Sequence, residues 1–365
     1  MNRELSLYLD AWRFTAAIVV LLGHLSGARF TEGLLWQFGP YMGEAVAIFF
    51  VLSGFVIGYA VDHREDSARA YFVARAARIY SVALPALLLT FALDAIGREA
   101  RPDLYSPEWG YVAEHRAWQF LSGLLFVNQI WGWNTAPGSN LPYWSLGFEI
   151  WYYVLFGIAF FAPRPWRMPA LVAVAIFVGP RILSLFPLWL IGFAGYRVCA
   201  SNLPGPRLGL ALFLGSAIAW IGYEVFAHPG WRLPLVPAWP LAEGFQSEDY
   251  LVGALFILHL IGFRAISGTA GRVILPLTRP IRWMAGATFT IYLFHLPVAQ
   301  FLATLMPWPP GSWMTRIVLI GGTLAALFAI AEFTERRKMV WRRGIEILLR
   351  PMAPGADRAA GPGKS

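Results

Sequence analysis

The residues best placed to do chemistry begin with an arginine and a histidine in the first apolar stretch of the chain. Arg13 and His24 are eleven residues apart. In a helix the two side chains would differ by only about 20° around the axis and lie about 16 Å apart along it. Because an imidazole titrates near neutral pH, His24 is a candidate general acid or base, with Arg13 on the same helix face.

Two later segments also place polar side chains among apolar residues. Ser145 and Glu149 are four residues apart, directly after Trp144, and Tyr292 and His295 are three residues apart. Residues three or four apart share one face of a helix. The Glu149 carboxylate lies one to two turns into an apolar run and needs a partner, for which the first-helix histidine or an arginine is the candidate. The alternative to a catalytic role is that Glu149 forms an ion pair that only stabilises the fold.

A basic pair lies between the second and third apolar runs. Arg75 and Arg78 are three residues apart in the segment Tyr-Phe-Val-Ala-Arg-Ala-Ala-Arg and share a face if a helix begins there. The forked guanidinium group suits phosphate. Two arginines in a loop beside a membrane are equally an ordinary signal of topology. The residues alone leave both interpretations open.

Other polar residues favour structural roles. Ser53 and Gly54 form a small spot suited to close helix packing, and His259 stands alone in an apolar run, so we expect it in the core. The single cysteine, Cys199, excludes an internal disulfide. The sequence contains no zinc-ligand spacing and no glycine-rich phosphate loop, so no metal site is predicted.

Composition identifies the elements that must position these residues as membrane helices. Hydrophobic residues make up 58% of the 365 residues and charged residues 14%, against roughly 25% charged in a soluble protein. The net charge of +8 does not indicate nucleic acid, because the basic residues are spread among short connections between apolar runs. We therefore predict an all-α integral membrane protein.

About ten apolar runs have spanning or near-spanning length. They fall near residues 12–30, 44–61, 79–97, 143–161, 168–182, 184–200, 208–227, 249–264, 283–303 and 313–332. The stretch 118–131 is too short to span and is expected to be interfacial or re-entrant. Residues 1–335 form the predicted membrane-embedded domain. Residues 336–365 form a basic, partly disordered cytoplasmic tail.

The positive charges predict the orientation of the chain. With ten spans and the N-terminus inside, 22 Lys and Arg residues fall on the inner side and seven on the outer side. Because cytoplasmic connections carry an excess of Lys and Arg, this split predicts that both termini are cytoplasmic.

Taken in order, these segments resemble the acyltransferase 3 family of polytopic membrane O-acyltransferases, over roughly residues 5–335. The motifs that carry the resemblance are Arg13 with His24 after ten residues, Ile48 to Phe55, Phe72 to Ile79 with Arg75 and Arg78, Trp144-Ser145-Leu146 with Glu149, and Tyr292-Leu293 with His295 and Pro297. Some members carry an extra extracellular hydrolase-like domain. This chain resembles the stand-alone form.

The resemblance implies transfer of an acyl group, commonly acetyl from acetyl-CoA, to a hydroxyl group of a carbohydrate or another metabolite. It implies the bacterial cytoplasmic (inner) membrane, acyl-CoA and a carbohydrate as partners, and no permanently bound cofactor. Surface polysaccharide, peptidoglycan, a signalling oligosaccharide and a macrolide all remain open as acceptors.

The resemblance also divides the work among the residues. Arg75 and Arg78 would bind the phosphates of CoA. His24 would act as the general base or carry a transient acyl group, and Glu149 would orient His24. Arg13 completes the predicted catalytic set. Ser145, Trp144, Tyr292 and His295 form the remainder of the predicted substrate-binding set, and aromatic residues such as Trp131, Trp133 and Tyr143 would stack on sugar rings. The rival interpretation is a transporter or flippase for a lipid-linked glycan.

The charge split gives a direct test of orientation. We expect a cysteine introduced at position 70, beside Arg75 and Arg78, to react with membrane-impermeant thiol reagents only after the membrane is opened. A cysteine introduced between residues 98 and 142 should react in intact cells. Labelling of position 70 from outside would contradict the predicted topology.

Overall fold

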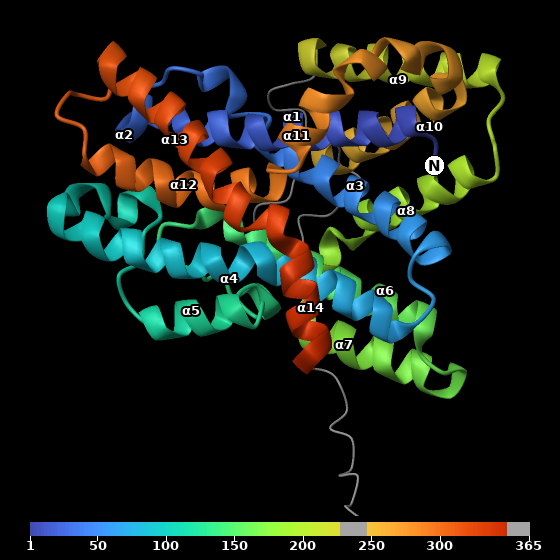
Figure 1. Ribbon diagram of the computed structural model, residues 1–365, viewed down its shortest axis with the longest axis horizontal. Helices are drawn as coiled ribbons and strands as arrows, with labels where there is room; N and C mark the ends of the chain where they lie inside the picture. Colours follow the sequence, from blue (N-terminus) through green and yellow to red (C-terminus); the bar gives the residue numbers. More distant parts are fainter. Residues whose placement is uncertain (227–246, 349–365) are drawn as a thin grey trace, which may run out of the picture.

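The computed structural model describes residues 1–226 and 247–348 and is built from helices (Figure 1). Its α-helices are α1 Arg3–Leu25, α2 Ala28–Thr31, α3 Met42–His63, α4 Ala68–Ala100, α5 Arg116–Leu124, α6 Trp144–Phe161, α7 Arg164–Ser184, α8 Phe186–Ala200, α9 Pro206–Phe226, α10 Ser247–Ala270, α11 Thr278–Ala285, α12 Thr288–Thr304, α13 Trp313–Phe333 and α14 Lys338–Leu348. The described residues contain no β-strand. The predicted all-α class is confirmed.

Each of the ten predicted apolar runs coincides with a helix. Within the described ranges, eight helices are long and apolar enough to cross a membrane. The segments Leu275–Ala285 and Thr288–Thr304, bent by 46° at their junction, form either a ninth, broken span or a re-entrant loop. Helix α8 has only 15 residues, about 22 Å of helix against a hydrocarbon core of about 30 Å. The predicted run at 184–200 is therefore an apolar helix of less than spanning length.

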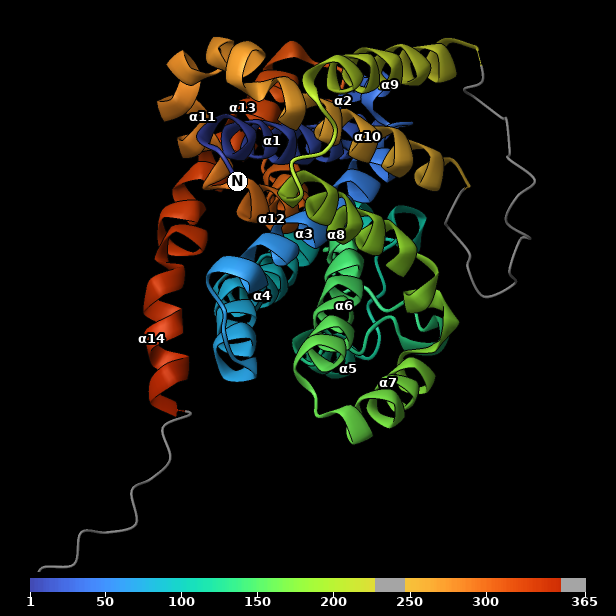
Figure 2. The ribbon, with the colours of Figure 1, turned by 90° about the vertical axis from the view of Figure 1, so that its right-hand side faces the viewer.

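The short segments agree with the sequence-based expectations only in part, because residues 338–348 of the predicted tail form a helix, α14, that packs on α4. Helix α5, with nine residues, covers the first part of the 118–131 stretch and is about 13 Å long, too short to span. Helix α7 contains a break at Gly179, which has a φ of +77° and precedes Pro180. Helix α14 lies beside α4 (Figure 2). The predicted disordered tail from residue 351 lies outside the described residues.

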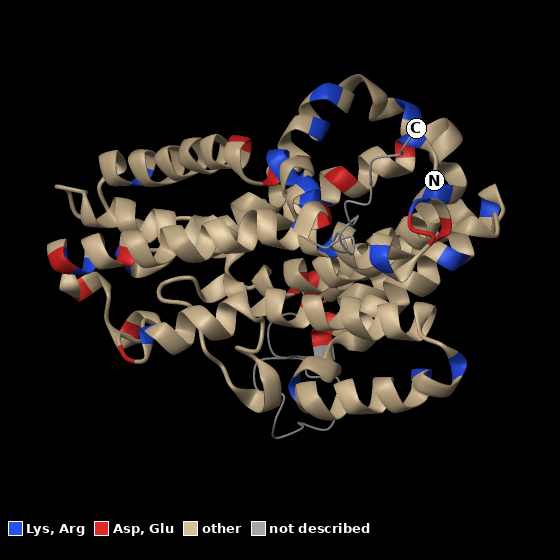
Figure 3. Cartoon of the chain, turned by 60° about the horizontal axis from the view of Figure 1, so that its bottom comes forward, with Lys and Arg blue, Asp and Glu red and all other residues tan. Residues whose placement is uncertain are grey.

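Helices α1, α4 and α12 pack together and run in the same direction, with their C-terminal ends on the left of Figure 1. Side-chain caps define where α1 and α4 begin, because Asn2 accepts from the Leu5 N–H and Ser67 from the Ala70 N–H. Lys and Arg lie mostly in the centre and right of Figure 3, the half that contains the N-terminus. That distribution matches the uneven charge split along the sequence.

Helices α3 and α8 approach each other through glycine. A Cβ atom on Gly54 would lie 1.9 Å from the Trp189 carbonyl oxygen, and one on Gly192 would lie 2.0 Å from the Val51 carbonyl oxygen. The two backbones are therefore in direct contact, as expected of small residues at membrane helix interfaces. The packing role predicted for Gly54 is confirmed. Its neighbour Ser53 is consequently held against α6 and α8.

This contact predicts that replacing two different glycines with alanine changes the stability of the protein by different amounts. We expect Gly192→Ala to destabilise the protein by about 1–3 kcal/mol, because the new methyl group forces the helices apart. A methyl group on Gly215 of α9 would meet no atom within 4 Å, so Gly215→Ala should be neutral or slightly stabilising. Thermal unfolding of both variants in the same detergent makes the comparison. Equal melting temperatures would contradict the close α3–α8 contact.

Candidate active site

A cavity of about 570 Å³ lies among α1, α3, α4, α6, α11, α12 and α14. We call it the chamber. Six of the nine predicted site residues line it: Arg13, Arg75, Arg78, Ser145, Glu149 and Tyr292. They come from four helices that are distant in sequence. The chamber wall carries seven Arg or Lys side chains and three carboxylates. It is therefore a net-positive space among apolar helices, and some of its lining residues, such as Arg64 and Lys338, are exposed.

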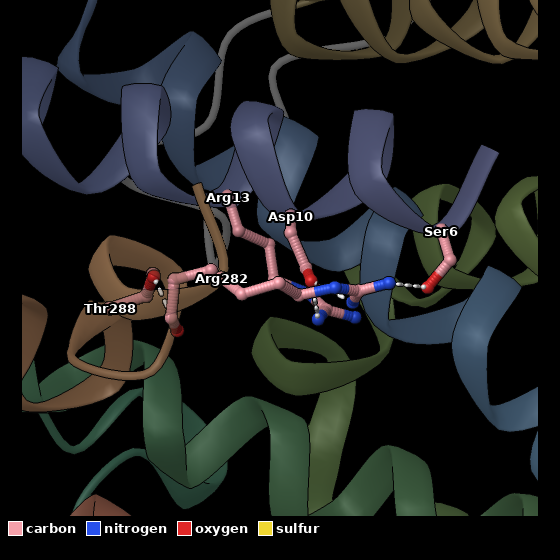
Figure 4. A network of polar contacts seen from close by, with 6 residues as sticks. Ser6, Asp10, Arg13, Arg282 and Thr288 are labelled. Atoms are coloured by element: carbon pink, nitrogen blue, oxygen red, sulfur yellow. Dashed lines mark hydrogen bonds and ion pairs between the residues drawn. The ribbon is translucent and has the colours of Figure 1, made fainter. Parts of the chain in front are cut away.

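Arg13 is held by an ionic cluster on one side of the chamber. Its guanidinium donates to Asp10, 3.2 Å away, and Asp10 also accepts from Arg282 of α11 (Figure 4). Arg282 in turn donates to the Ser6 hydroxyl at 2.9 Å. Because α1 begins at Arg3, about 15 Å of helix precedes Arg13. Arg13 therefore lies well inside α1 and not at its start, where the first apolar run alone would place it.

Arg75 and Arg78 lie in the second and third turns of α4 rather than in a loop. The predicted shared helix face is confirmed, since both line the chamber. Their surroundings differ. Arg75 forms an ion pair with Glu65 in which both side chains are largely buried, 11% and 7% exposed. Within the described part of the chain, Arg78 makes no direct hydrogen bond or ion pair, and the carboxylates of Glu149 and Glu335 act on it only from a greater distance.

Glu149 has partners that the sequence did not suggest. Its carboxylate accepts from the Ser53 hydroxyl at 2.9 Å and from the Tyr153 hydroxyl. The Trp189 indole N–H donates to Ser53 at 3.2 Å, which fixes that hydroxyl. Among the hydrogen bonds of the described residues, none joins Glu149 to His24. The expected direct pairing of these two residues is therefore not what the structure contains.

His24 instead pairs with His295. The His24 Nδ1 atom lies 3.1 Å from His295 Nε2, and His295 is fully buried. His295 Nδ1 lies 3.0 Å from the carbonyl oxygen of Ile291. A carbonyl only accepts, so a neutral His295 carries its proton on Nδ1 and presents Nε2 as an acceptor. His24 must then carry its proton on Nδ1.

This assignment leaves the other nitrogen of His24 free for chemistry. Its Nδ1–H is shared between His295 Nε2 and the Val20 carbonyl oxygen, 3.0 Å away. The Nε2 lone pair of His24 is then unprotonated, as a general base or nucleophile requires. His295 thus occupies the place beside His24 that sequence reasoning gave to Glu149.

Tyr292 connects the histidine pair with the chamber. It lines the chamber and accepts from the Ser145 hydroxyl at 2.9 Å. His295 lies three residues later on α12, about 4.5 Å along the axis, and the two rings are 6.4 Å apart. The histidine pair therefore lies just beyond the chamber wall.

Two of the remaining predicted aromatic residues differ from expectation, whereas Trp131 and Trp133 are 56% and 50% exposed and stay predictions. Trp144 packs on Phe50 and Phe148, with ring centroids 6.5 and 5.2 Å apart, and does not line the chamber. Tyr143 is fully buried and donates to the Gly123 carbonyl oxygen, so its predicted contact with sugar is wrong. His259 is buried against the Tyr8 hydroxyl at 2.6 Å, as its predicted core role requires.

Sequence reasoning missed several groups in the chamber. Asp10, Tyr153, Arg282, Glu335 and Lys338 all contribute to its wall. Glu335 accepts from the first N–H groups of α12, those of Phe289 and Thr290. No local spacing links such residues, because Asp10 and Arg282 are 272 positions apart. Within the described residues, no group of His, Cys, Asp or Glu has the arrangement of a metal site.

A bundle of apolar helices around a net-positive chamber defines a multi-pass membrane protein with an internal reaction or binding site. The chain belongs to a family of acyltransferases, whose defining region, described as "Acyltransferase domain", matches residues 6–332. The expectation drawn from the five motifs is confirmed.

Proteins of known name are similar in sequence to this chain. The chain is 26% identical to the exopolysaccharide production protein ExoZ of Rhizobium meliloti, over 68% of this chain and 74% of that protein. It is 25% identical to an O-acetyl transferase of Shigella phage Sf6, over 80% and 84%. It is also 25% identical to the peptidoglycan O-acetyltransferase OatA of Listeria monocytogenes, over 90% of this chain but only 54% of OatA. No solved structure matches the chain significantly.

The unequal surroundings of the two arginines predict unequal effects on folding. We expect Arg75→Ala to destabilise the protein by about 3–5 kcal/mol, because it leaves the Glu65 carboxylate buried without its cation. Arg78→Ala should cost much less, since no described partner loses its counter-ion. Melting temperatures in detergent test this difference. Adding Glu65→Gln to Arg75→Ala should restore part of the loss, and an Arg78→Ala loss as large as that of Arg75→Ala would contradict the assignment.

Proposed function

We propose that this protein transfers an acyl group from the thioester of coenzyme A to a hydroxyl group of a carbohydrate. The membrane would be the bacterial cytoplasmic membrane, with the chamber open to the cytoplasm. The observation that carries the proposal is the chamber itself. Its seven cations against three carboxylates suit a polyanionic donor, and its inner wall ends one helical turn from a histidine pair.

The donor's phosphates would bind at the Arg75–Arg78 end of the chamber. The Arg78 guanidinium makes no direct hydrogen bond or ion pair within the described residues, and a fork of N–H donors binds phosphate oxygens in a bidentate manner. Arg13 and Lys338 line the same space and add positive charge. The thioester arm would extend along the chamber past Ser53 and Glu149 towards Tyr292. This arrangement places the acyl carbon on the side of α12 that carries His295.

His24 would then act on the acceptor hydroxyl. Its Nε2 atom removes the hydroxyl proton as the oxygen attacks the thioester carbonyl carbon. The carbon–sulfur bond breaks, and the proton passes from the imidazolium to the departing thiolate sulfur. His295 holds the His24 tautomer that leaves Nε2 free, and the Tyr292–Ser145 hydrogen bond fixes the wall beside it. The same lone pair would serve the alternative route through an acyl-histidine.

Glu149 acts at a distance from the histidines. With Ser53 and Tyr153 donating to it, the carboxylate forms a fixed negative point within a positive chamber. An anion there would reduce the repulsion among the cationic groups that bind the donor. The relatives named as O-acetyltransferases support acetyl as the acyl group and a cell-surface glycan as the acceptor.

The decisive residue test uses His24→Gln. Glutamine keeps a polar side chain but cannot exchange a proton near neutral pH, so we expect acyl transfer per folded molecule to fall about 10²–10⁴-fold with little loss of stability. His63→Gln, which alters an exposed histidine at the end of α3, is the matched control and should retain activity. The assay measures acyl-CoA consumption by purified protein supplied with surface glycan. A folded His24→Gln protein that still transfers would eliminate His24 as the base.

The function as a whole is tested in cells. We expect mass spectrometry of surface glycans to show less O-acylation in a deletion strain than in its parent, restored by the wild-type gene and not by the His24→Gln variant. An unchanged O-acyl content, together with no dependence on acyl-CoA in the purified protein, would favour the rival role in glycan transport.

A further inference from the structure

A second cavity, of about 520 Å³, lies at the other end of the helices that form the chamber. We call it the aromatic cleft. Its wall includes Arg29, Asp103, Glu108, Trp109 and Trp308, and it lies where α1, α4 and α12 have just ended. Arg78 of the chamber and Arg101 of the cleft wall are 23 residues apart along α4, which corresponds to an axial distance of about 35 Å. These two residues mark the far ends of the two cavities, whereas on α12 the lining residues Tyr292 and Ala303 are only about 16 Å apart.

The histidine pair lies between the two cavities. On α12, Tyr292 lines the chamber, Ala303 lines the cleft, and His295 lies between them. His295 is about 4.5 Å along the axis from Tyr292 and about 12 Å from Ala303. His24 is one residue before the end of α1, and Arg29 of the cleft follows it by five residues. Along α12, the chamber and the cleft therefore lie on opposite sides of the histidine pair.

The cleft differs from the chamber in its chemistry. Arg29 stacks on the Trp109 ring, 5.0 Å from guanidinium carbon to ring centroid, and donates to the Trp109 carbonyl oxygen. Its Nε atom is buried and has no hydrogen-bond partner among the described residues. Trp308 is 43% exposed. Two flat aromatic rings therefore frame a space that also contains an incompletely bonded guanidinium.

The charges in the cleft are balanced. Two cations, Arg29 and Arg101, and two carboxylates line the same cavity, and Arg101 forms an ion pair with one of them, Asp103. A polyanion would meet as many carboxylates as cations there, in contrast to the net-positive chamber. Carboxylates that accept and guanidinium groups that donate are instead suited to hydroxyl groups. Aromatic faces provide apolar surface for the C–H face of a sugar ring.

We propose that the aromatic cleft binds the carbohydrate acceptor, with sugar rings on Trp308 and Trp109 and with hydroxyl groups bonded to Arg29 and Glu108. This inference rests on the proposed acyltransferase function and adds the place and chemistry of acceptor recognition. Donor and acceptor then reach the histidine pair from opposite ends of the bundle, and neither has to leave before the other enters.

The test compares two tryptophans only five positions apart. Trp308 lines the cleft, whereas Trp313, which is 66% exposed at the start of α13, does not. The probe is O-deacylated surface polysaccharide from the deletion strain, cut to short oligosaccharides. We expect Trp308→Ala to raise the KM for this acceptor at least tenfold while the KM for acyl-CoA is unchanged. Trp313→Ala should leave both values unchanged.

A second readout separates loss of acceptor binding from damage to the catalytic machinery. Slow hydrolysis of acyl-CoA, with water as the acceptor, should proceed at the wild-type rate in Trp308→Ala and in Arg29→Gln. Equal acceptor KM values for wild type and Trp308→Ala would overturn the cleft as the acceptor site while leaving the acyltransferase function intact. No acyl-CoA turnover by the wild-type protein, with or without glycan, would overturn both proposals.

Discussion

The structure depends above all on the need to pair charges inside an apolar helix bundle. A cation that leaves water for a membrane interior must find an anion or hydrogen-bond acceptors. Asp10 forms ion pairs with both Arg13 and Arg282, and so joins α1 to α11. Glu65 does the same for Arg75, and Glu335 accepts from the start of α12. These contacts hold open a polar chamber that apolar packing alone would fill.

The chamber retains more cations than its carboxylates can neutralise. That excess is unfavourable in the empty protein and becomes favourable when a polyanion binds, which is the physical basis for assigning the donor to this end. Arg78 illustrates the point, because it lines the chamber while the neighbouring Arg75 is already committed to Glu65. One arginine of the pair thus stabilises the fold, and the other makes no direct ion pair within the described residues.

The histidine pair shows how backbone geometry can set the chemistry of a side chain. The Ile291 carbonyl oxygen determines which nitrogen of His295 carries a proton, and His295 then determines the tautomer of His24. No carboxylate is needed for this. Close contact of α3 with α8 through Gly54 and Gly192 holds Ser53 in place, and Ser53 in turn orients Glu149. The rigid apolar contacts therefore support the polar ones.

The sequence by itself determined the membrane class, the approximate places of the apolar helices and the family, because apolar runs and short motifs are properties of neighbouring residues. It also placed Arg13 with His24, and Tyr292 with His295, on shared helix faces. It did not predict α14 or where α1 and α4 begin. Only the tertiary structure decided which of these faces meet. It paired His24 with His295 instead of Glu149, added Asp10 and Arg282 to the chamber, and brought Trp109 and Trp308 together in the cleft. Such pairings join residues up to 272 positions apart, and helix periodicity carries no information about which helices become neighbours, since that choice is made by packing and charge pairing across the whole bundle.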